Sequence, residues 1–164
     1  MSATPTTAGR RPDLAYDDDG NLLIDVRGPR FGAAITATVL GLALVLQGPV
    51  GTLLVAWQVT AFAVATIAGL AWSPYGQLFR VVKRRLDLGP PPAVEHEAPP
   101  RFAQACGLAF AGAGLVALLA GATTLGWVLV GVVLGLSALL ALTGLCVGCE
   151  LYLVGQRLRA RTGA

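Results

Sequence analysis

The sequence predicts an all-α membrane protein in which four transmembrane helices form two parallel hairpin repeats, each followed by a basic interfacial helix. Two long stretches, residues 31–79 and 102–149, contain no Asp, Glu, Lys or Arg. Each matches two spans joined by a tight turn, because one span needs about 20 apolar residues. The whole chain is 55% hydrophobic and 13% charged, whereas soluble domains carry about 25% charged residues.

The chain divides into a polar segment and one membrane domain. Residues 1–23 are predicted to be disordered, although the Asp-Gly-Asn sequence at 19–21 could start a short hairpin or lie on the membrane surface. The membrane domain covers residues 24–161. Its predicted spans are 31–47, 52–72, 102–120 and 127–145, with turns at 48–51 and 121–126.

Each pair of spans is expected to lead into an amphipathic basic helix at the membrane surface. Ser73 is a favourable N-cap and Pro74 a favourable first helical residue, so the first such helix is predicted over 75–86. The second is predicted over 149–161. A Pro-rich linker, 87–99, separates the two halves.

The two halves resemble each other in sequence. The tripeptide Pro-Arg-Phe begins the first span at residues 29–31 and the third span at 100–102. An alignment without gaps of 73–85 with 146–158 pairs Phe79 with Tyr152. This pattern predicts a parallel repeat, with one unit at about 29–86 and the other at about 100–161.

The basic residues predict the topology. All twelve lie before the first span, between the second and third, or after the fourth. Four spans place these segments on one side, and the positive-inside rule makes that side cytoplasmic, together with both termini. The net charge of +3 therefore reflects topology and does not indicate binding to nucleic acid.

Cys146 and Cys149 form the one constellation with clear chemical potential. Two cysteines separated by two residues can form a disulfide, share a metal or pass oxidising equivalents. If the fourth span continued through Cys149, the helix dipole and Glu150 would suppress the thiolate. If the helix breaks where Ser73 and Pro74 break the first half, the pair lies in a first helical turn that favours the thiolate. The alternative is packing, with Gly144 and Gly148 as a small-residue face.

Other polar residues have weaker claims to a site. Cys106 lies one turn into the third span, on the same side as the cysteine pair. A zinc site with His96 is disfavoured because the ligand spacing matches no closed zinc motif, so no metal is expected. Arg30 and Arg101 are expected to contact lipid headgroups, and the alternative is a site for an anionic ligand. No ionisable residue lies deep in a span, which argues against a proton-coupled transporter.

Three segments resemble a known family. PPRFAQACG (99–107), SPYGQLFR (73–80) and GLCVGCELY (144–152) are together similar to DUF4395, a bacterial membrane domain of unknown function. The resemblance covers about residues 24–157 and implies a multi-pass protein of the bacterial inner membrane. It also implies partners among thioredoxin-like and rhodanese-like proteins of sulfur metabolism. An additional Cys-Pro near the N-terminus, frequent in such proteins, is replaced here by residues 24–29, IDVRGP.

Two functions are compatible with these observations. In the first, Cys146 and Cys149 exchange electrons or sulfur with a soluble partner, and Cys149 attacks because it lies nearer to water. In the second, the protein is a small transport or scaffold subunit, for instance for a sulfur-containing anion, and the cysteines only pack. Neither function requires a cofactor, and in neither is the protein expected to be a stand-alone enzyme. Both functions are compatible with a homo-oligomer in the bilayer.

The charge pattern predicts that both termini face the cytoplasm. A reporter fused after Ala164 should be active only when that reporter works in the cytoplasm. Activity of a reporter that works only outside would overturn this topology.

Overall fold

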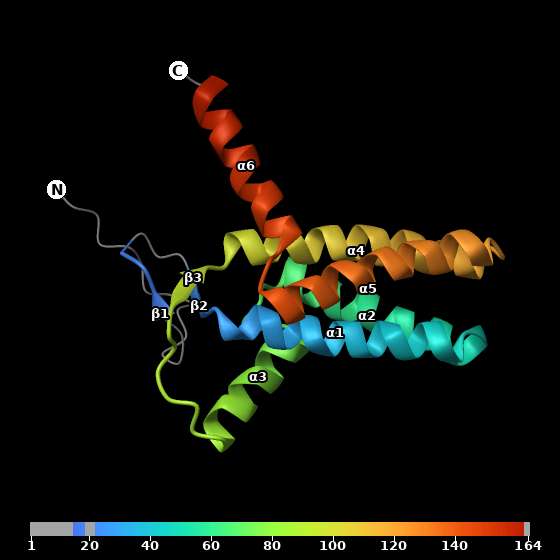
Figure 1. Cartoon of the computed structure of the whole chain (residues 1–164), viewed down its shortest axis with the longest axis horizontal. Coiled ribbons are helices and arrows are strands. Elements are labelled where there is room, and N and C mark those ends of the chain that lie inside the picture. The colour runs from blue at the N-terminus through green and yellow to red at the C-terminus, as the bar shows by residue number, and fades with distance from the viewer. Residues whose placement is uncertain (1–14, 19–21, 163–164) are drawn as a thin grey trace.

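A computed structural model describes residues 15–18 and 22–162. Within these residues it contains four long helices, two shorter helices and three short strands (Figure 1). The long helices are α1 (Arg27–Leu46), α2 (Gly48–Ile67), α4 (Ala98–Leu119) and α5 (Thr123–Thr143). The shorter elements are α3 (Pro74–Arg85), α6 (Val147–Thr162), β1 (Ala15–Tyr16), β2 (Leu22–Asp25) and β3 (Val94–His96).

The predicted four-span helical architecture is confirmed at this level, since all four long helices are long and apolar enough to cross a membrane. They lie side by side, with α1 packed on α2 and α5, and α4 packed on α2 and α5. The α1–α2 and α4–α5 turns lie at one end of the bundle (Figure 1). The helices α3 and α6 and the small sheet lie at the other end and project away from it.

The predicted turns at 48–51 and 121–126 are wrong in extent, because α2 already begins at Gly48 and α5 at Thr123. Left-handed backbone at Gln47 (φ 41°) and Gly48 (φ 53°) reverses the chain within two residues. Pro49 fits the first turn of α2, where a missing N–H costs nothing. At the opposite end, α1 and α4 begin about one turn before the predicted spans.

The linker between the halves is held in place. The strand β3 pairs antiparallel with β2, with Leu23 opposite His96 and Ile24 opposite Glu95. Arg27 also donates hydrogen bonds to the carbonyls of Leu88 (3.0 Å) and Pro90 (3.3 Å). The Pro-rich linker is therefore fixed by the sheet and by Arg27. Of the predicted disordered segment 1–23, residues 1–14 and 19–21 lie outside the described residues, while Ala15–Tyr16 forms β1 and β2 begins at Leu22.

A charged cluster joins the sheet to α3. Asp25, at the end of β2, forms salt bridges with Arg27 (2.8 Å) and with Lys83 of α3 (2.9 Å). Burial opposes ionisation of Asp25, but hydrogen bonds from Arg27 and Lys83 outweigh it and lower the carboxyl pKa to about 2. The carboxylate therefore stays charged at neutral pH and ties α3 to the start of α1.

Small side chains bring the long helices together. The core contains Leu40, Val55, Ala111 and Val130, none of which is exposed. A Cβ added at Gly114 would lie 3.2 Å from the carbonyl oxygen of Gly126, so α4 and α5 cross at near backbone contact. Such crossings stabilise membrane bundles, in which lipid removes most of the hydrophobic drive for association.

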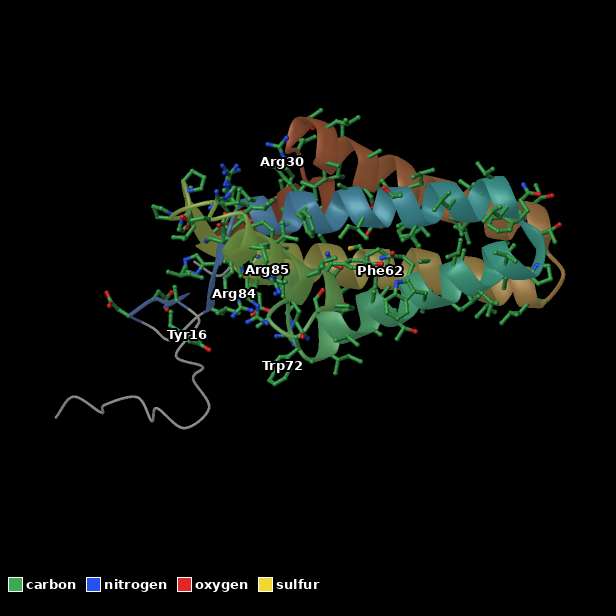
Figure 2. All side chains as sticks on the ribbon, turned by 90° about the horizontal axis from the view of Figure 1, so that it is seen from below. Tyr16, Arg30, Phe62, Trp72, Arg84 and Arg85 are labelled. Carbon is green, nitrogen blue, oxygen red and sulfur yellow. The ribbon has the colours of Figure 1, made fainter. Side chains whose placement is uncertain are left out.

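Two arginines cap helix ends in the opposite half of the chain. Arg30, in the first turn of α1, donates to the carbonyls of Ala141 (3.3 Å) and Leu142 (3.4 Å) at the end of α5. Arg101, in the first turn of α4, donates to those of Thr66 (2.8 Å) and Ile67 (2.9 Å) at the end of α2. Figure 2 shows Arg30 at the same end of the bundle as Arg84 and Arg85 of α3.

Replacing Arg101 by Leu should destabilise the bundle by about 1–3 kcal/mol, because two charged hydrogen bonds to a helix end are lost. Thermal unfolding of the purified protein in detergent measures this change. The matched control is Arg157→Leu on the exposed face of α6, which should leave the melting temperature unchanged. Equal effects of the two variants would contradict a capping role for Arg101.

Candidate functional site

The fourth span breaks just before the cysteine pair, so of the two alternatives that the sequence left open, the structure has the broken helix. The helix α5 ends at Thr143, and Gly144 adopts a left-handed conformation (φ 79°) that terminates it. The N–H of Leu145 donates to the Thr143 hydroxyl at 3.1 Å. A second helix, α6, then begins at Val147 and leaves the bundle in a new direction (Figure 1).

Cys146 lies at the N-cap of α6. Its Sγ accepts a hydrogen bond from the backbone N–H of Cys149 at 3.3 Å. The same contact starts α3, where the Ser73 hydroxyl accepts from the N–H of Gly76 at 3.5 Å. A thiol thus takes the position that serine takes in the first half, and the sulfur lies at the positive end of the helix dipole.

The two thiols have unequal acidity. A hydrogen bond from the Cys149 side chain lowers the pKa of Cys146 to about 7, although burial and the Glu95 carboxylate oppose this effect. The same hydrogen bond, with burial, raises the pKa of Cys149, and Glu95 and Glu150 add to it. Cys146 is therefore the more acidic thiol of the pair.

Contacts with α4 hold the first turn of α6. A Cβ added at Gly148 would lie 2.7 Å from the Cβ of Ala103, so only glycine permits this approach. The rings of Phe102 and Tyr152 also pack with centroids 5.7 Å apart. Of the two glycines expected to form a packing face, Gly148 packs against α4, whereas Gly144 ends α5.

A cavity of about 580 Å³ opens beside the cysteine pair at this end of the bundle. Cys106 of α4 and Cys146 both line it, so the structure brings these two predicted residues together. His96 lies instead in β3, with its Nδ1 3.5 Å from a carboxylate oxygen of Asp17. Across residues 15–18 and 22–162, no group of three His, Cys, Asp or Glu side chains is arranged to hold a metal ion.

The structure adds polar residues that sequence reasoning did not assign to the site. Gln58, fully buried, donates to the Thr36 hydroxyl (3.1 Å) and accepts from the Tyr75 hydroxyl (2.8 Å). The indole N–H of Trp57 completes this polar network by donating to Tyr75 (3.1 Å). The signal for this network in the sequence was a glutamine within an apolar span. Nothing in the sequence signalled Glu95, because Glu95 approaches the cysteines only through the pairing of β3 with β2.

Alkylation of Cys146 should follow its thiolate fraction and reach half its maximal rate near pH 7. Mass spectrometry after pulses of iodoacetamide at a series of pH values measures this midpoint. Glu95→Gln should move the midpoint to lower pH, because its carboxylate disfavours the thiolate. A midpoint near the ordinary thiol value of about 8.5 would contradict the arrangement.

Comparison with known protein families gives a match over most of the chain. The family model described as "Domain of unknown function (DUF4395)" matches residues 24–157. No curated protein and no solved structure matches the chain. The matched region includes all four long helices and the cysteine pair at the start of α6. The chain therefore belongs to the DUF4395 family.

Proposed function

We propose that this protein is a membrane thiol–disulfide exchange protein whose Cys146 and Cys149 react with a soluble thioredoxin-like or rhodanese-like partner. One observation carries the proposal: the Cys146 sulfur is the N-cap of α6 and accepts the Cys149 N–H. This position stabilises a thiolate through a backbone donor and the helix dipole together. If the cysteines only packed, the Cys146 sulfur would need neither the hydrogen bond from the Cys149 N–H nor a position at the start of a helix.

The hydrogen bonds favour Cys146 as the attacking thiol, in place of the Cys149 expected from access alone. The Cys146 thiolate attacks a sulfur of the partner's disulfide, and the partner's other sulfur leaves as a thiolate. Cys149 then loses its proton and attacks Cys146 Sγ, which releases the reduced partner and leaves a Cys146–Cys149 disulfide. The reverse exchange follows the same path, and the two reduction potentials set its direction.

The membrane placement that we propose puts this chemistry in the cytoplasm of a bacterial cell, at the inner membrane. The start of α6, where the cysteine pair lies, shares one end of the bundle with α3 and the sheet (Figure 1). The basic residues of α3 and α6 also belong to this end, as the positive-inside rule requires of a cytoplasmic face. In this placement α3 and α6 lie at the membrane surface and leave the start of α6 accessible from the cytoplasm.

We also propose that the two halves are a duplicated unit, of which only the second carries the thiol pair. Phe31 packs on Phe79 with ring centroids 5.5 Å apart, as Phe102 packs on Tyr152. Each half also supplies one arginine that caps a helix of the other. The N-cap is Ser73 in the first half and Cys146 in the second. This difference supports the idea that the second half kept the capping position and gained a reactive thiol there.

Single-cysteine variants test the exchange function. With Cys149→Ser, Cys146 has no resolving thiol and should accumulate a mixed disulfide with an oxidised thioredoxin-like or rhodanese-like protein. Cys146→Ser should form none, and Cys106→Ser should behave as the unmodified protein. Non-reducing gels of native membranes with mass spectrometry of the adducts give the readout. If no variant forms an adduct and the pair never changes its oxidation state, the transport or scaffold function is the better one.

A further inference from the structure

The cavity beside Cys146 has mainly apolar walls, and its lining also includes neutral polar side chains and the charged Asp25, Arg80 and Lys83. All six helices contribute to its lining, together with the three strands. Its apolar wall includes Phe62, Phe110, Val133 and Leu140, and Figure 2 shows Phe62 between the long helices. Its volume of about 580 Å³ is in the range of small-molecule sites, about 300–1,000 Å³.

Among the polar side chains in the lining, Gln104, Ser137 and Thr36 can each donate a hydrogen bond to a ligand. The Gln104 amide of α4 and the Ser137 hydroxyl of α5 make no hydrogen bond to another described residue, and both line the cavity. Thr36 is 97% buried, since only 3% of it is exposed; its hydroxyl accepts from Gln58 and keeps its own hydrogen for another acceptor. Because each of these groups can donate a hydrogen bond, they favour a ligand that carries carbonyl oxygens.

We infer that this cavity binds an isoprenoid quinone of the bilayer, which accepts two electrons from the Cys146–Cys149 dithiol. The inference rests on the proposed exchange function, because it requires the pair to alternate between dithiol and disulfide. A quinone has two ring carbonyls for the free donors and an apolar tail that reaches the site from lipid. Cys146 lines the cavity, whereas Cys149, in the first turn of α6, is not part of the lining, so Cys146 is the sulfur that a bound ring would meet.

The electron transfer balances without a further reactant. The Cys146 thiolate adds to a ring carbon and forms an S–C bond. The Cys149 thiolate then attacks Cys146 Sγ, the S–C bond breaks, and its electron pair remains on the ring. The two thiol protons end on the two quinone oxygens, so dithiol and quinone become disulfide and quinol. A soluble dithiol partner returns the pair to its reduced form by exchange.

The test uses the whole protein in lipid nanodiscs, reduced and kept anaerobic, with a ubiquinone analogue that carries one isoprene unit. The fully substituted ring of this probe disfavours a permanent thioether. One quinol should form for each chain, and mass spectrometry should show a Cys146–Cys149 disulfide. Cys149→Ser should form no quinol, because the S–C bond then has no resolving thiol.

Two variants with a matched control locate the reaction in the cavity. Gln104→Leu and Ser137→Leu should each raise the half-saturating quinone concentration about tenfold, because each removes a hydrogen bond. Gly135→Leu adds the same side chain to α5 where an added Cβ meets nothing within 4 Å, and it should change nothing. Equal kinetics in all three variants would mean that the reaction occurs in bulk lipid, which overturns the inference.

A second readout separates this inference from the proposed function. Exchange between the pair and a reduced thioredoxin-like protein is followed by the same mass spectrometry without quinone. Exchange with no quinone reduction would overturn the quinone site and leave the exchange function standing. Quinone reduction with no protein exchange would support the site and contradict the soluble partner. If neither reaction occurs, both proposals fail.

Discussion

The constraint on which this structure depends is that a helix end near lipid must find partners for its last carbonyl groups within the protein. Two of the four long helices, α2 and α5, receive an arginine from the opposite half. The guanidinium groups satisfy the carbonyls and place positive charge at the negative end of each helix dipole. They also fix which helices are neighbours, since each bond joins one half of the chain to the other.

The hydrogen bonds from Arg30 to the end of α5 help to determine where the cysteine pair lies. Arg30 holds the end of α5, and the guanidinium also lies 3.7 Å from the position of a Cβ on Gly144. The chain therefore leaves α5 at a defined point, and two residues separate Gly144 from the first turn of α6. Contact between Gly148 and Ala103 then fixes that turn against α4. The position of Cys146 follows from the packing of three helices.

Features set by local sequence could be predicted, and features set by distant contacts could not. The spans follow from the absence of charge. The likeness to Ser73 and Pro74 suggested a break before α6, but the sequence left an unbroken fourth span as the alternative. The strand β3 was missed because its sequence lies among prolines and its partner β2 is about 70 residues away. The acidity of Cys146 relative to Cys149 could not be derived from spacing, since it depends on which sulfur accepts the hydrogen bond.

The brevity of the α1–α2 and α4–α5 turns determines how the protein can adapt to membrane thickness. A 20-residue helix such as α1 is about 30 Å long, close to the hydrocarbon thickness of a bilayer. The reversal at Gln47 and Gly48 carries no charge, so a thicker bilayer can submerge that end at small cost. The opposite end, with its arginines and sheet, cannot be submerged. Changes in lipid length should therefore be absorbed at the turn end, and the depth of the thiol pair below the headgroups should stay constant.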